Sequence, residues 1–144
     1  MDTTKWTTLV DPRFDLTVRY PAVTPDGHQV ERTNEHEETS ITVRLTADTK
    51  RALYVEITRF PDATVESLYA AICTLSTRNP AALSVGILQE TTLGTHQAHT
   101  FFLRRDALER TVLLIQRGSD AYRITYDSTS VLSEQVFSTI TFAA

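Results

Sequence analysis

Residues 41–60 read ITVRLTADTKRALYVEITRF, and this stretch decides the class of fold. Between residues 41 and 47, apolar and polar side chains alternate strictly, which is typical of a β-strand with one buried face. Asp48-Thr49-Lys50 is typical of a turn, and residues 53–60 alternate again. Because the connection is so short, we expect the two strands to be antiparallel neighbours. The inward residues of the second strand are Leu53, Val55 and Ile57.

The chain before this hairpin is predicted to hold a second hairpin and a long loop. Residues 7–10 favour a short strand, Asp11-Pro12-Arg13 a turn, and residues 14–20 a strand whose apolar residues share one face. Residues 21–39 are irregular and include the acidic cluster Glu35-His36-Glu37-Glu38. We expect a long, solvated, mobile loop there, with at most one short strand near residues 29–32.

After the 41–60 hairpin, the spacing of apolar residues changes from that of a strand to that of a helix. Residues 61–64 open this helix, with Asp62 or Thr64 as its N-cap. An apolar stripe at helical spacing follows, formed by Val65, Leu68, Tyr69, Ile72 and Leu75. Asn79-Pro80 ends the helix or begins a short extra turn. A second, short helix is predicted from residue 131, capped by Ser130 or Thr129, with a short strand at residues 139–142.

Between the two helices the period of two returns. It predicts strands at residues 85–93, 98–105, 109–116 and 122–126. Residues 112–115, VLLI, are apolar on both faces, so we expect this strand at the centre of a sheet with cover on both sides. The order of strands, helix, strands and helix, joined by tight turns, predicts an α+β fold in which helices flank a large antiparallel β-sheet.

Length and composition limit the possible functions. The 144 residues contain no repeat or linker, so residues 1–144 are expected to form a single domain. The 24 threonines favour strands, and many fall on their polar positions. The net charge is −4, which argues against a general binder of nucleic-acid backbones. We therefore expect no nucleic-acid partner.

The termini and the single cysteine give further expectations. Cys73 is alone, so an intramolecular disulfide is impossible, and we expect a small buried hydrophobe. The N-terminus has no signal-peptide core, and no apolar run approaches the roughly 18–20 residues that span a bilayer. The expected compartment is cytoplasmic for the chain as written, and extracytoplasmic if a leader or lipoprotein anchor was removed.

The histidines and acidic residues form two candidate metal sites, both weak. His96 and His99 have the spacing of a ligand pair on a helix, but three residues apart on a strand they face opposite sides. His36 lies among Glu35, Glu37 and Glu38, which could hold a divalent cation, but the spacing is not that of an EF-hand. We assign no metal-ligating residue and no cofactor.

Basic and aromatic residues form a third candidate. A basic stripe could be built from Arg104, Arg105, Arg110, Arg117 and Arg123, with Phe101 and Phe102 beside it. Interleaved acidic residues favour ordinary cross-strand ion pairs instead. Trp6 is expected to close one end of the core. Motifs for nucleophilic catalysis and phosphate binding are absent from the sequence, so we assign no catalytic residue and do not expect an enzyme.

Three stretches carry a family resemblance. Residues 93–98, LGTHQA, precede an alternating strand; residues 122–127, YRITYD, precede a short helix and the ending STITF at 138–142; and Trp6 precedes a strand that ends in Tyr20-Pro21. These motifs resemble the PsbP-like family, named after an extrinsic subunit of the photosystem II oxygen-evolving complex. The sequence departs from the family where Thr95 and Gln97 replace frequent Gly and Pro. It also lacks a tryptophan after Pro21 and a lipoprotein cysteine before Trp6.

The resemblance implies an α/β/α sandwich, similar to a Ran-binding nuclear import factor and to chaperones of type VI secretion effectors, whose common theme is binding a partner protein. Our leading hypothesis is a non-catalytic partner-binding or accessory domain that uses a sheet face or the 21–39 segment. One alternative is a small-ligand or divalent-metal binding protein, using the acidic cluster or a pocket between sheet and helix. A remote alternative is an enzyme with His96 or His99 beside a carboxylate and a hydroxyl.

Overall fold

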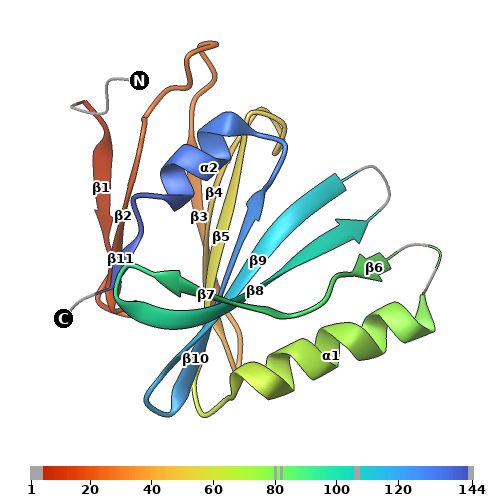
Figure 1. Cartoon of the computed structure of the whole chain (residues 1–144). Helices are drawn as coiled ribbons and strands as arrows, with labels where there is room; N and C mark the ends of the chain where they lie inside the picture. The colour runs from red at the N-terminus through yellow and green to blue at the C-terminus, as the bar shows by residue number, and fades with distance from the viewer. Residues whose placement is uncertain (1–4, 80, 82, 106–107, 143–144) are drawn as a thin grey trace.

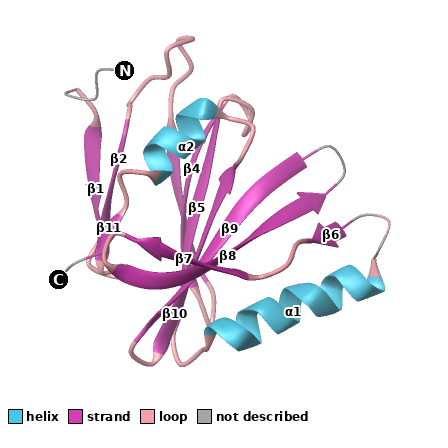
Figure 2. Cartoon of the chain, in the orientation of Figure 1, coloured by secondary structure: helices cyan, strands magenta, loops and turns pink. Residues whose placement is uncertain are grey.

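The computed structural model describes residues 5–79, 81, 83–105 and 108–142. Strands dominate the described chain, with two helices packed against them (Figure 2). The strands are β1 (Thr7–Val10), β2 (Leu16–Tyr20), β3 (Glu31–His36), β4 (Ile41–Ala47), β5 (Leu53–Phe60), β6 (Leu83–Val85), β7 (Gln89–Leu93), β8 (His96–Arg105), β9 (Leu108–Arg117), β10 (Asp120–Asp127) and β11 (Thr141–Phe142). The helices are α1 (Val65–Arg78) and α2 (Val131–Phe137).

The strands form two antiparallel sheets (Figure 1). The large sheet has the order β3-β4-β5-β10-β9-β8-β6, with β7 also paired to β8. The small sheet has the order β1-β2-β11. The predicted α+β class and the large antiparallel sheet are confirmed. The N-terminal hairpin lies outside the large sheet. One edge of β2 pairs with β1 and the other edge pairs with the C-terminal β11.

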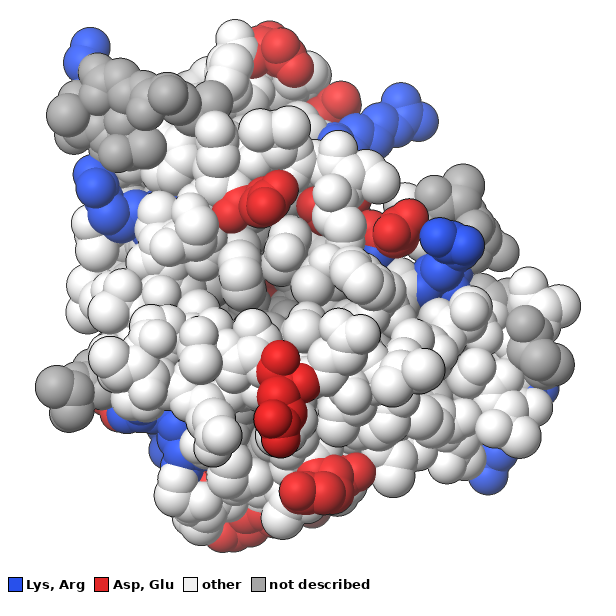
Figure 3. Space-filling view, in the orientation of Figure 1, with Lys and Arg blue, Asp and Glu red and all other residues white. Residues whose placement is uncertain are grey.

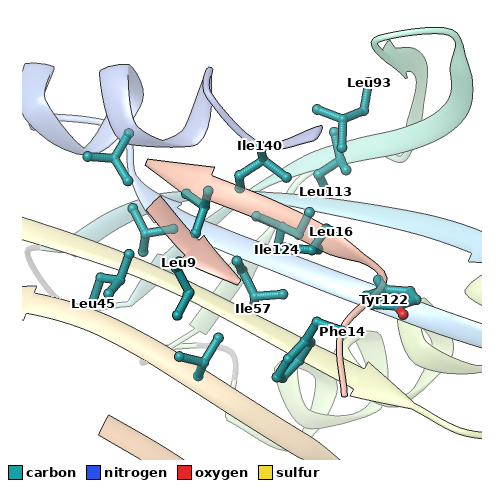
Figure 4. Packing of buried hydrophobic residues seen from close by; sticks show 14 of the residues in the cluster. Leu9, Phe14, Leu16, Leu45, Ile57, Leu93, Leu113, Tyr122, Ile124 and Ile140 are labelled. Carbon is teal, nitrogen blue, oxygen red and sulfur yellow. The ribbon is translucent and has the colours of Figure 1, made fainter. Parts of the chain in front are cut away.

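The large sheet is covered on both faces, as the sequence of β9 predicts. Leu113 and Ile115 point into a cluster that the small sheet and α2 complete (Figure 4). Val112 and Leu114 point the other way, into a smaller cluster with Val65 of α1. All four residues of the VLLI stretch are buried. We call these two sides of the large sheet the core face and the α1 face.

Both helices begin at predicted N-caps. The Thr64 hydroxyl accepts from the Ser67 backbone N–H, and the Ser67 side chain reciprocates with the Thr64 N–H, which completes a capping box. Ser130 caps α2 through one hydrogen bond, which its side-chain oxygen accepts from the Ser133 N–H. Asn79 is the C-cap of α1, and the neighbouring Pro80 of the predicted helix end lies outside the described residues.

The prediction of a loop over residues 21–39 is wrong for residues 31–36, which form β3. This strand pairs with β4, with Thr33 opposite Arg44. All six of its side chains are exposed, so no apolar alternation marks it in the sequence. β3 is therefore stabilised by its backbone pairing with β4 and not by the burial of apolar side chains.

The prediction of a single strand at residues 85–93 is also wrong. Residues 86–88 separate β6 from β7, and the Gly86 N–H donates to the Phe102 carbonyl at 2.8 Å. A Cβ at Gly86 would lie 3.2 Å from both N and O of Phe102, so this close approach favours glycine. Cys73 is half-buried rather than buried, and Trp6 packs against the main cluster as expected.

Candidate functional site

The α1 face of the large sheet has two different halves. α1 packs against β6 and β9, and the apolar residues of its stripe lie over that half. The other half is formed by β3, β4, β5 and β10, where polar side chains occupy alternate positions. Glu56 of β5 lies at the centre of this polar half and is almost fully buried.

Glu56 is held by three donors from three strands. Its Oε2 accepts from Nε of Arg44 at 2.7 Å and from the Tyr54 hydroxyl at 2.6 Å. Its Oε1 accepts from Arg123 at 3.3 Å. Arg44 also donates to the Glu35 carboxylate of β3, so the ion pairs run from the edge of the sheet to β10. Beside them, the hydroxyls of Thr42 and Thr58 lie 2.9 Å apart. We call Glu35, Arg44, Tyr54, Glu56 and Arg123 the Glu56 network.

Strand register produces this network. The tight turn between β4 and β5 places Arg44 directly opposite Glu56. Tyr54 lies two residues from Glu56 on the same strand, so both side chains leave the same face. In the pairing of β5 with β10, Thr125 lies opposite Glu56, which leaves Arg123 in the diagonal position from which its long side chain reaches the carboxylate.

The electrostatics fix the protonation states of the network. Burial raises the pKa of Tyr54 to about 12, and the neighbouring Glu56 charge adds to this rise. Burial also acts to raise the pKa of Glu56, but the hydrogen bonds from Tyr54 and Arg44 and the charge of Arg123 outweigh it, so the pKa lies below its ordinary value. Near neutral pH the phenol is therefore protonated and the carboxylate ionised.

A cavity of about 250 Å³ adjoins the network under the C-terminal half of α1. Its polar wall includes Tyr54, Glu56, Arg110 and Arg123. The Arg110 guanidinium lies 3.9 Å from the centre of the Tyr54 ring, a cation–π contact. The rest of the lining is mainly apolar and consists of Ile72, Leu75, Leu83, Leu103, Leu108 and Val112, together with Arg105 and Thr125. The polar residues Tyr54, Glu56 and Arg123 come from β5 and β10, whereas the apolar ones come from α1, β6, β8 and β9. The cavity can therefore take a molecule with one polar end and one apolar end.

The structure brings together part of the predicted basic stripe. Arg105, Arg110 and Arg123 line this one cavity. Arg104 instead pairs with Glu109 across the hairpin at 3.4 Å, and Arg117 pairs with Asp15 at 2.7 Å, as cross-strand and surface ion pairs. On the side shown in Figure 3, basic side chains are scattered around the rim, and most acidic side chains lie nearer the middle of the view.

Phe101 and Phe102 do not join this stripe as an aromatic pair. Phe101 is buried against Tyr69 of α1, with ring centres 5.1 Å apart, whereas Phe102 is exposed. Adjacent strand residues face opposite sides, so the two rings cannot form one stacking platform.

The candidate metal residues are separated. His96 lies on the core face beside the Phe142 ring and Arg117, whereas His99 faces the hollow near the start of α1. Glu35 belongs to the Glu56 network, and His36, next to it on β3, faces the other side. Among residues 5–79, 81, 83–105 and 108–142, no three His, Cys, Asp or Glu side chains gather as a metal site requires.

A second polar hollow lies where the β9–β10 turn meets the small sheet. It is lined by Arg59, Arg117, Asp15 and Asp120, among others. Arg59 donates to the Asp120 carboxylate, and this hydrogen bond is the main cause of an Asp120 pKa below its ordinary value. The acidic and basic side chains here pair with one another. We interpret the hollow as a link between the two sheets rather than as a binding site.

The Glu56 network was not predicted as a site from the sequence, whereas three arginines of the cavity, Arg105, Arg110 and Arg123, were predicted as members of a basic stripe. Arg44 and Glu56 could have been paired from the short turn between their strands. Tyr54 and Glu56 were also visible as polar residues at positions where a half-buried strand faces away from the core. The third strand, β10, meets β5 only through the tertiary fold, and nothing local in the sequence places Arg123 there.

Comparison with solved structures identifies the class of fold. The chain has a PsbP-like fold: it is similar to cyanobacterial PsbP from Synechocystis sp. PCC 6803, a structure determined in solution, with a TM-score of 0.64, 10% identity, and coverage of 99% of this chain and 95% of that chain. It is also similar to a protein from Bacteroides thetaiotaomicron, with a TM-score of 0.50, 12% identity, and coverage of 98% of this chain and 50% of that one. At these identities the likeness concerns the fold alone.

No family model and no curated protein sequence matches this chain. Within the described residues, neither helix has the length and apolar character to cross a membrane. The resemblance seen in the sequence is thus confirmed at the level of the fold.

Proposed function

We propose that residues 1–144, as one domain, act as a non-catalytic accessory protein that binds a partner protein. A PsbP-like fold is consistent with an accessory or binding role. The observation that carries the proposal is β3, an edge strand with six exposed side chains beside the polar half of the α1 face. Two candidate recognition surfaces were named from the sequence, the 21–39 segment and a sheet face. β3 belongs to that segment and lies next to the polar half of the α1 face, so the two surfaces adjoin.

The outer edge of β3 can accept another strand. β3 ends the strand order of the large sheet, and within the described chain no strand pairs with its far side. Such an edge presents backbone N–H and C=O groups that an extended segment of a partner can use. Side-chain charge then selects the segment. Residues 31–38 hold four glutamates and one arginine, so a basic segment fits this edge.

The Glu56 network holds part of this surface in place. Glu35 on β3 is half exposed and is fixed by Arg44, which is itself fixed by the buried Glu56. Side chains that are already ordered lose less conformational entropy when a partner binds. The network therefore supports recognition without supplying a catalytic group.

The experiment is site-specific photo-crosslinking in lysate of the source cells. A photoreactive amino acid replaces Thr33 on β3 and, in the control protein, Thr77 on the exposed side of α1. We expect an adduct of one defined mass at position 33 and none at position 77. The double variant Glu31→Lys/Glu37→Lys is expected to remove the adduct, because it turns an acidic edge into a basic one.

A matched control carries the same change of charge elsewhere. Glu66 and Glu90 are exposed on α1 and β7, so Glu66→Lys/Glu90→Lys leaves β3 untouched and should retain the adduct. Equal labelling at positions 33 and 77 would contradict the proposal. An adduct that survives reversal of the β3 charges would also contradict the mode of recognition. The compartment stays a prediction: cytoplasmic as written, or extracytoplasmic after loss of a leader or anchor.

A further inference from the structure

We propose that the cavity under the C-terminal half of α1 binds a small carboxylate that carries a short aliphatic chain. Arg110 and Arg123 hold the carboxylate beside Tyr54, and the apolar wall holds the chain. This site is separate from the β3 edge and does not depend on partner binding.

The arginines that line the cavity outnumber its carboxylates: Arg110 and Arg123 lie near Tyr54 and Glu56, and Arg105 lies beside Leu83 and Leu108. Arg105, Arg110 and Arg123 line the cavity together with one carboxylate, Glu56, which Arg44 also neutralises. Within the described residues, neither Arg105 nor Arg110 forms an ion pair, although Asp127 lies opposite Arg110 on β10. Arg104, on the opposite face, pairs with Glu109. A local excess of positive charge in a chain of net charge −4 favours an anionic ligand.

Arg110 is oriented for this role. Its guanidinium lies over the Tyr54 ring at 3.9 Å, and the Tyr54 hydroxyl is anchored on Glu56 at 2.6 Å. Stacking on the ring restrains the plane of the guanidinium and leaves its N–H groups free to donate to a carboxylate in a bidentate pair. Glu56 remains ionised beside this position and repels a second negative charge, which acts against a dianion such as a phosphate monoester.

The apolar end is incompletely covered by the protein. Leu75 belongs to the inward stripe of α1, yet 51% of its surface is exposed, and Leu108 of β9, which also lines the cavity, is equally exposed. Ile72, Leu83 and Leu103 complete this wall. A bound aliphatic chain would remove these side chains from water. The volume of about 250 Å³ is just below the roughly 300–1,000 Å³ of sites for drug-sized ligands, which fits a chain of about eight carbons.

The test is a titration of the ¹⁵N-labelled protein with octanoate, followed by amide chemical shifts. We expect saturable shifts in α1 around Ile72 and Leu75 and in β9 around Arg110. Acetate lacks the chain, octan-1-ol lacks the charge and hexyl phosphate carries two charges at pH 7.5. Each should bind at least about ten-fold more weakly, as expected for the loss of one charge-assisted contact or of the buried chain.

Two variants and a matched control locate the site. Arg110→Gln should weaken octanoate binding by about ten-fold or more, and Leu75→Gln should weaken it through the other end of the cavity. Arg104→Gln changes an arginine on the same hairpin but on the opposite face, and it should leave the affinity unchanged. The proposal is overturned if octan-1-ol binds as tightly as octanoate, if Arg104→Gln and Arg110→Gln have equal effects, or if no saturable shifts occur. Preference for hexyl phosphate would instead indicate a phosphate site and overturn the carboxylate assignment.

Discussion

The two faces of the large sheet are built by the same strands but hold different chemistry. On the core face, the described residues include a cluster of twenty buried side chains that joins the small sheet, the large sheet and α2. On the α1 face, the corresponding cluster has four members, and the rest of the face is occupied by the Glu56 network and the cavity. Because strand side chains alternate, one sheet can use one face for stability and the other for recognition.

The difference follows from what covers each face. The core face meets another sheet and a helix, so nearly every inward position can be a branched aliphatic residue or an aromatic one. The α1 face meets a single helix that reaches β6 and β9, so the strands beyond it must satisfy polar side chains by pairing them with one another. Because α1 covers only part of the α1 face, the uncovered strands hold the Glu56 network, and the cavity lies beside it.

The largest expected loss in the free energy of unfolding comes from a substitution on the core face. Ile57→Ala deletes a side chain that is 1% exposed and leaves a cavity between the two sheets. We expect a loss of about 2–5 kcal/mol in the free energy of unfolding, measured by chemical denaturation. Ile57→Val removes a single methylene and should lose only about 0.5–1.5 kcal/mol. A loss from Ile57→Ala below that of Ile57→Val would contradict the role assigned to the core face.

The next effect concerns the Glu56 network. Glu56→Gln removes the charge that Arg44 and Arg123 face and weakens the acceptor of the Tyr54 hydroxyl. We expect a loss of about 1–3 kcal/mol in the free energy of unfolding at pH 7. The partly exposed arginines can turn toward water, so the loss should stay below that of Ile57→Ala.

The difference in unfolding free energy between the wild type and Glu56→Gln should depend on pH in one direction. The pKa of Glu56 is lower in the folded protein than its ordinary value of 4.5, so its ionised form is the one that folding stabilises. The stabilisation is present above pH 4.5 and is lost as the pH falls through the folded-state pKa. Denaturation curves should therefore show the gap between the wild type and Glu56→Gln narrowing below pH 4.5. A gap that widens in acid would reverse the assigned ionisation.

A smaller effect is expected at the start of α1. Thr64→Ala removes the side-chain acceptor of the capping box, and a loss of about 1 kcal/mol should follow. Thr74→Ala, on the exposed side of the same helix, provides the matched control. Because alanine has the higher helix propensity, this control should not destabilise the protein. Equal losses from the two variants, seen in thermal or chemical unfolding, would mean that the cap does not anchor α1.

The sequence predicts those features that local patterns encode. Alternation places β4 and β5 as neighbours, the VLLI stretch of β9 predicts a strand buried on both sides, and Thr64 and Ser130 mark the starts of the helices. β3 was predicted only in part, as a short strand near residues 29–32, because its six residues are all exposed and its pairing with β4 is what stabilises it. A pocket between sheet and helix was predicted only as an alternative and without its residues, because its walls come from segments as far apart as Tyr54 and Arg123, which meet only after folding.

The most direct test of the two-face account compares two residues of β9. Leu113 points into the core face and is 4% exposed, whereas Arg110, three residues earlier, points into the cavity on the α1 face. Chemical denaturation should show a loss of about 2–5 kcal/mol for Leu113→Ala and of only about 1 kcal/mol for Arg110→Gln, which loses the cation–π contact with Tyr54. If Arg110→Gln destabilises the fold as much as Leu113→Ala, the α1 face is part of the structural core and the division of roles between the faces is wrong.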